Sequence, residues 1–102
     1  MQMPVDDPLD YVSKIGEMAG VSNRAQGIAM RIVGDAKLKH VTSGKDPSGL
    51  AAAALYIASQ SENDMVTQHD LSRAANVTEV TIRNRKRELV EELNLDDQGT
   101  LD

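Results

Sequence analysis

The 102-residue sequence contains no cysteine, tryptophan or phenylalanine, and Tyr11 and Tyr56 are its only aromatic residues. Without cysteine there is no disulfide framework, no thiolate nucleophile and no cysteine-based zinc site, which suits an intracellular protein. So few aromatic rings also argue against a stacking platform for single-stranded nucleic acid. The first eight residues have neither a basic start nor an apolar stretch, so no secretory signal is expected.

Long hydrophobic runs are missing as well. The most apolar stretch is Leu50 to Ala58, whose only polar side-chain group is the Tyr56 hydroxyl. Its Ala and Leu residues favour a helix, and nine helical residues rise only about 14 Å, less than half of a bilayer's hydrocarbon core. We therefore expect a fully buried helix at the centre of one small domain, with no membrane partner.

Start and stop signals divide the rest of the chain into four further helices. Two of the five helices are expected to begin at Asp-Pro pairs, with the Asp as N-cap and the Pro at the first helical position. The expected helices are 8–19, ending at Gly20; a second capped by Ser22, with apolar positions to Ala36 and an extension through Leu38 and Val41; 47–60; 68–75, with Thr67 and Asp70 as a capping box; and 79–93, capped by Thr78. The sequence thus predicts an all-α fold, a compact five-helix bundle around a central Ala-rich helix.

Two glycines, Gly27 and Gly34, lie seven residues apart on one face of the second expected helix. A glycine inside a helix costs up to about 1 kcal/mol relative to alanine, but it permits close helix packing. We therefore expect a neighbouring helix to approach this face.

The net charge of −5 is unevenly distributed. Residues 22–45 hold five cations against one carboxylate, and residues 67–90 hold five cations against three, so two basic segments lie in an acidic chain. Each is a candidate contact surface or a solvated face. The acidic tail, 96–102, is expected to be disordered, which leaves 6–95 as the folded domain.

Residues 67–93 form the informative unit, a short helix, a tight turn and a longer helix. The buried positions of a helix-turn-helix have the spacing of Leu71, Ala75, Val77 and Ile82, and Asn76 takes the turn position where Gly is common. The same unit also occurs as plain packing in many helical proteins, so this pattern alone leaves DNA binding open.

The outer face of the longer helix carries side chains of the kind that read DNA. In the major groove Arg makes a bidentate contact to guanine, Val contacts a thymine methyl group and Glu accepts from a cytosine amino group. Thr hydroxyls and amides at a helix start hold phosphate. The candidate DNA-binding residues are Thr78, Glu79, Val80, Thr81, Arg83, Asn84 and Arg87. The alternative is a solvated face on which cations 83–87 pair with Glu79, Glu88, Glu91 and Glu92.

No stretch of the sequence resembles a reaction site. His40 and His69 fall on different expected helices, and there is no HExxH motif, Gly-rich phosphate loop or paired nucleophile and base. We therefore expect no enzyme activity, no metal and no cofactor.

Two motifs together resemble a known family. Gly-Leu-Ala-Ala-Ala-Ala-Leu-Tyr-Ile-Ala at 49–58, Thr-Gln at 67–68 and Val-Thr-Glu-Val-Thr-Ile-Arg-Asn-Arg at 77–85 are similar to the second, C-terminal cyclin-like repeat of transcription initiation factor IIB and its archaeal counterpart, transcription factor B. The resemblance covers roughly residues 6–95. It implies a five-helix cyclin-like fold with the helix-turn-helix at its C-terminal end.

The resemblance also implies a function. Such a repeat binds promoter DNA beside the TATA-binding protein and reads the upstream recognition element in the major groove. The base-reading positions of the family fall on Val80 and Arg83. Lys86 departs from the pattern, which usually has Tyr after Arg-Asn-Arg. The zinc ribbon and first repeat have no counterpart here, so contact with RNA polymerase is not assigned to this chain, which looks like a fragment or an isolated domain.

Alternative interpretations stay open. A cyclin-type adaptor would bind a protein without reading bases, and the basic segment 22–45 would suit an acidic partner. A dedicated repressor would need a dimerisation surface, and the sequence shows no heptad seam, so a monomer is expected. The location implied is cytoplasmic in an archaeon and nuclear in a eukaryote.

The acidic composition further suggests a salt-loving archaeal source, because at molar salt the release of counterions contributes little to DNA binding. A DNA affinity that fell steeply with salt would contradict that idea.

Overall fold

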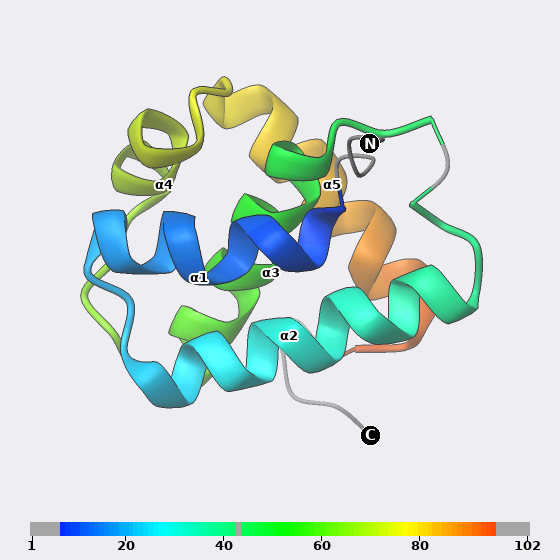
Figure 1. Cartoon of the computed structure of the whole chain (residues 1–102), viewed down its shortest axis with the longest axis horizontal. Coiled ribbons are helices and arrows are strands. Elements are labelled where there is room, and N and C mark those ends of the chain that lie inside the picture. Colours follow the sequence, from blue (N-terminus) through cyan, green and yellow to red (C-terminus); the bar gives the residue numbers. More distant parts are fainter. Residues whose placement is uncertain (1–6, 43, 96–102) are drawn as a thin grey trace, which may run out of the picture.

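The computed structural model describes residues 7–42 and 44–95, and it is built from α-helices. The helices are α1 (Pro8–Ala19), α2 (Asn23–Leu38), α3 (Pro47–Ser61), α4 (Gln68–Ala75) and α5 (Glu79–Leu93). Figure 1 shows α1 and α2 crossing the front of the molecule, with α3 behind them. The predicted all-α class and five-helix order are confirmed. In the described part of the chain no helix is long and apolar enough to cross a membrane.

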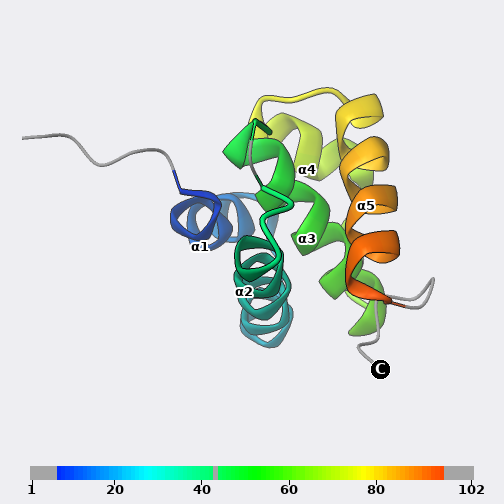
Figure 2. The same ribbon diagram turned by 90° about the vertical axis from the view of Figure 1, so that its right-hand side faces the viewer.

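Helix α3 is the centre of the bundle and contacts each of the other four helices. In Figure 2 it lies between α1 and α2 on one side and α5 on the other. Its residues 51–55 are completely buried, as expected from the Ala-rich sequence. Small alanine side chains let neighbouring backbones approach closely, so one short helix can support four others.

The predicted helix caps are largely confirmed. Asp7 accepts a hydrogen bond from the Leu9 amide at 3.0 Å, and Gly20 ends α1 with φ of 79°. Asp46 differs, because it lies at the N-cap of α3 but makes no side-chain bond to the helix backbone. Its carboxylate accepts instead from the Ser48 hydroxyl at 3.1 Å.

The expected role of Gly27 and Gly34 is wrong. A Cβ atom at either position would meet nothing within 4 Å, because this face of α2 is turned away from the other helices. The extension of α2 is also shorter than expected, since the helix ends at Leu38 and does not reach Val41. The predicted acidic tail, 96–102, lies outside the described residues.

Candidate nucleic-acid interface

Three helix caps shape the unit formed by α4, the turn and α5. Thr67 and Asp70 make both bonds of a capping box, so the start of α4 is fixed as expected. Asn76 ends α4 in the left-handed conformation with φ of 58°, which Asn tolerates better than most residues. Thr78 then accepts from the Thr81 amide at 3.1 Å and starts α5.

The packing inside this unit follows the predicted helix-turn-helix spacing. Leu71 on α4 and Ile82 on α5 are fully buried, Ala75 is nearly so, and Val77 packs against the core between the two helices. The inner faces of α4 and α5 are therefore used for folding, and their outer faces are left for contacts.

The structure brings the seven candidate DNA-binding residues together on the first nine residues of α5 and its N-cap. Figure 2 shows α5 at the edge of the molecule, with no other helix on its outer side. Four of the residues are exposed, namely Thr78, Val80, Arg83 and Arg87, and three are partly buried, namely Glu79, Thr81 and Asn84. Val80 is 54% exposed, so a branched apolar side chain stands in solvent among the polar groups.

The guanidinium groups of Arg83 and Arg87 form hydrogen bonds to neutral side chains. Arg83 donates to the Gln68 amide oxygen at 3.1 Å, and Arg87 donates to the Asn84 amide oxygen at 3.2 Å. Among the described residues neither forms an ion pair with a carboxylate. Their positive charge is therefore available to a ligand.

Of the cations in residues 83–87, only Arg85 is paired with a carboxylate, as the solvated-face alternative predicts. Arg85 donates to Glu88 at 2.9 Å, and Lys45 approaches the same carboxylate at 3.5 Å. Glu79 faces His69 instead, with 3.4 Å between the carboxylate oxygen and Nδ1. The pairing of residues 83–87 with Glu79, Glu91 and Glu92, which the solvated-face alternative describes, is not found within the described chain.

Thr81 is placed differently from the other candidates. Its methyl group lies against Gly49 at the start of α3, and its hydroxyl accepts from the Thr78 hydroxyl at 3.1 Å. Both ends of the side chain are thus used inside the protein. Thr81 anchors the start of α5, and Thr78 is the more exposed residue of the pair, with its hydroxyl bonded to Thr81.

Three residues around this face were not among the candidates predicted from the sequence. Gln68 contacts Arg83, His69 contacts Glu79, and the Lys86 ammonium lies over the Tyr56 ring at 5.2 Å from its centroid. Each contact joins two helices, so spacing along one helix gives no signal for it. The departure of Lys86 from the family pattern was the one available hint.

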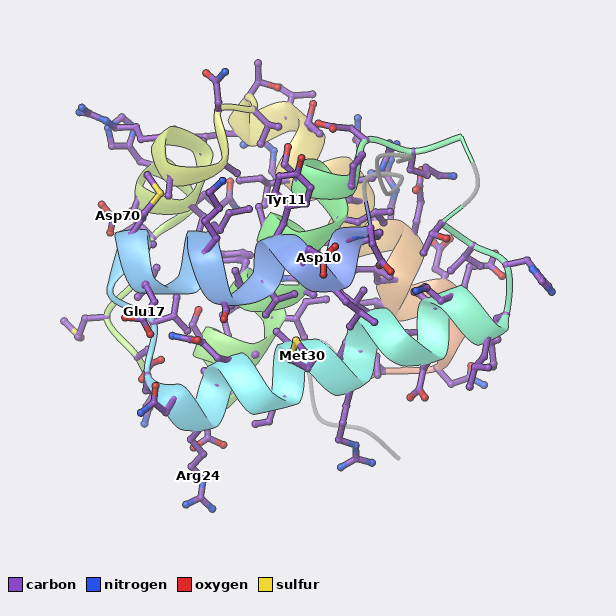
Figure 3. All side chains as sticks on the ribbon, in the orientation of Figure 1. Asp10, Tyr11, Glu17, Arg24, Met30 and Asp70 are labelled. Atoms are coloured by element: carbon purple, nitrogen blue, oxygen red, sulfur yellow. The ribbon has the colours of Figure 1, made fainter. Side chains whose placement is uncertain are left out.

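The other basic segment, residues 22–45, has fewer unpaired cations than its composition suggests. Arg24 pairs with Glu62 at 3.2 Å, and Lys37 pairs with Asp7 at 2.7 Å. Figure 3 shows Arg24 extending away from the body of the molecule. The hydrogen bond from Lys37, followed by that from the Leu9 amide, lowers the pKa of Asp7.

No cluster of side chains suited to metal binding is found in the described part of the chain. At least three His, Asp or Glu side chains would have to converge to hold a metal ion, and residues 7–42 and 44–95 contain no such group. His69 instead lies beside Glu79 on the outer surface.

Comparison with known proteins gives one family. The transcription factor TFIIB repeat matches residues 1–92, a repeat with a cyclin-like all-helical fold. The chain is 46% identical over 95 residues to transcription initiation factor IIB of Sulfurisphaera tokodaii, which covers 93% of this chain and 31% of that protein. It is 47% identical to the same factor of Caldivirga maquilingensis, covering 93% and 28%. It is 50% identical over 88 residues to transcription initiation factor IIB 1 of Thermococcus kodakarensis, covering 86% and 29%.

The chain thus spans less than a third of the length of these archaeal relatives. The matched family consists of transcription initiation factors and not of enzymes, as the sequence indicated. With nearly all of its residues matched, this chain belongs to the transcription factor TFIIB repeat family.

Proposed function

We propose that this chain is a promoter DNA-binding domain of a general transcription initiation factor. It corresponds to the second repeat of such a factor, reads the upstream recognition element in the major groove and docks with the TATA-binding protein. One observation carries the proposal, the exposure of Val80 beside two arginines that no carboxylate neutralises in the described chain.

The arrangement suits a helix inserted into the major groove. The first residues of a recognition helix meet base edges, and here those residues are Glu79, Val80 and Arg83. Arg83 fits a bidentate contact to guanine and Val80 fits a thymine methyl group, while Glu79 accepts from cytosine. The free amides at the start of α5, beside the exposed Thr78, fit a phosphate, and the Thr78 hydroxyl would join them by turning its proton from Thr81 to the ligand.

The start of α5 is built rigidly enough for this role. Its cap is fixed by Thr78, its buried side is held by Ile82, and its third residue, Thr81, packs on α3. A groove-reading helix gains affinity when its orientation is set before binding, because less freedom is then lost on contact.

A protein-binding adaptor without base readout receives less support. Its basic segment, 22–45, has two of its cations paired with carboxylates of this chain, through Arg24 and Lys37, and Lys45 approaches Glu88. No corresponding pairing occupies Arg83 or Arg87 in the described residues. Arg31 and Lys39 of segment 22–45 form no ion pair in the described chain either, but Arg83 and Arg87, unlike them, lie with exposed Val80 on the helix-turn-helix, where DNA binding predicts free charge.

The test is binding to labelled promoter duplex with and without the TATA-binding protein. We expect weak binding by the domain alone, stronger binding in the ternary mixture, and a preference for certain bases upstream of the TATA element. A domain that enters the ternary complex equally well on duplexes with scrambled upstream bases would favour the adaptor. A domain that binds neither component would reject both the DNA-reading and the docking roles.

A further inference from the structure

A hollow of about 470 Å³ lies between the start of α4 and the middle of α5. Three cationic side chains line it, together with one amide, one carboxylate and one apolar group. These residues are Gln68, Arg83, Lys86, Arg87, Val90 and Glu91. It adjoins the base-reading positions, because Arg83 belongs to both.

Lys86 is held in this hollow by the ring of Tyr56. The ammonium lies 5.2 Å from the ring centroid, within the range of a cation–π contact, and the side chain is partly buried. A lysine anchored in this way has lost much of its freedom before any ligand arrives. Its charge is not neutralised, because no described carboxylate forms an ion pair with Lys86.

The chemistry of the hollow selects an anion with several acceptor oxygens. Lys86 and Arg87 supply charged donors, and the Gln68 side chain has an amide nitrogen left to donate while its oxygen accepts from Arg83. The single carboxylate, Glu91, leaves an excess of positive charge. A phosphate of a duplex whose groove holds the start of α5 has this chemistry and lies beside the bases being read.

We propose that this hollow binds one phosphate of the DNA backbone, with Lys86 as its principal charge. The inference rests on the proposed function and deepens it, since it gives a role to the position at which the chain departs from its family's pattern. Lys86 positions the duplex through its backbone, and Arg83 reads the sequence. The two contributions are therefore separable by experiment.

The test measures how the affinity of the ternary complex for promoter duplex depends on salt. Replacing Lys86 with Gln or Tyr should lower the slope of log affinity against log salt by about 0.9, the value for one lost phosphate contact. The advantage of the wild-type domain over either variant should accordingly shrink about fourfold between about 0.2 and about 1 M KCl. The preference for bases should stay unchanged.

Two further variants serve as controls. Lys86→Arg keeps the charge and should keep the slope, and Arg31→Gln removes an exposed cation of α2 that does not line the hollow and should leave the slope unaltered. Circular dichroism at each salt concentration verifies that every variant is folded. Lys86→Tyr also restores the residue usual in the family, so a loss of slope in this variant reports charge and not packing.

The outcomes distinguish this inference from the proposed function. A Lys86→Gln domain with the wild-type slope would overturn the phosphate contact and leave sequence-specific binding standing. A Lys86→Gln domain with an altered base preference would overturn it too, because the residue would then read bases. Absence of specific binding by the wild-type domain would reject the proposed function itself.

Discussion

The Cγ2 methyl group of Thr81 lies 3.1 Å from the position that a Cβ atom on Gly49 would occupy. Here the first turn of α5 approaches the first turn of α3 more closely than a residue with a Cβ atom at position 49 would readily allow. The relationship links the core helix directly to the helix that we propose enters DNA.

Replacing Gly49 with Ala tests this contact. Alanine favours the helix by up to about 1 kcal/mol, but its methyl group would push on Thr81, which is tied to Thr78 and cannot move freely. Thr81→Ser removes the methyl group and keeps the hydroxyl. Urea unfolding of the wild type, both single variants and the double variant should show Gly49→Ala more favourable by about 1 kcal/mol when it is combined with Thr81→Ser. Equal effects in both backgrounds would contradict the close approach.

On the exposed face of α2, in contrast, we expect replacement of glycine by alanine to stabilise the domain. Gly27→Ala and Gly34→Ala should each stabilise the domain by about 0.5–1 kcal/mol, because a methyl group there meets nothing and the unfolded chain loses freedom. Gly20→Ala is the matched contrast, since its φ of 79° should make the substitution destabilising. Thermal unfolding shows whether each of the three substitutions raises or lowers the stability of the domain. A loss of stability at position 27 or 34 would indicate an unrecognised contact on this face.

Arg83 should determine one base of the recognised sequence. Arg83→Ala is expected to weaken binding of the promoter duplex by about 1–3 kcal/mol and to relax the preference at a single base pair. Gln68→Ala should give a smaller effect at the same base pair, because Gln68 only orients the guanidinium. Selection from randomised duplexes measures both. Arg31→Ala is the control, and an unchanged base profile in the Arg83 variant would reject the assigned role.

Asp7 should make the stability of the domain depend on pH. Its folded-state pKa is lowered by Lys37 and by the Leu9 amide, so the ionised form stabilises the fold at pH values above the unfolded pKa. This contribution should disappear as the pH falls through the folded pKa. Asp7→Asn keeps a good N-cap and removes the charge. It should cost stability near pH 7 and cost less below about pH 4. Urea unfolding at both pH values measures this, and a pH-independent difference would contradict the ion pair with Lys37.

Much of the fold follows from local signals in the sequence. Helix boundaries at Pro8, Pro47, Gln68 and Glu79 are as predicted, because caps and Asp-Pro pairs act within a few residues. The burial of α3 also follows, since a helix that is apolar all round has no face to offer to water. The glycine expectation failed because a residue pattern shows which face a residue lies on but not whether another helix covers it.

The candidate site is predicted less completely. Spacing along one helix places Val80, Arg83 and Arg87 on a common outer side, and the structure agrees. It also placed Thr81 there, although contact with Gly49 from another helix engages its methyl group. The contributions of Gln68 and Lys86 depend on helix-to-helix distances, which no one-dimensional pattern contains.

The alanines of α3 have a consequence for how such a domain can change. Any larger side chain between residues 51 and 54 would force several helices apart at once, so this axis resists substitution. The exposed side chains of α5 are not packed between helices, so they can be exchanged without disturbing the core. Under the proposed function, new base preferences can therefore arise by exchanging a few solvent-facing groups of α5 while the scaffold beneath them stays constant.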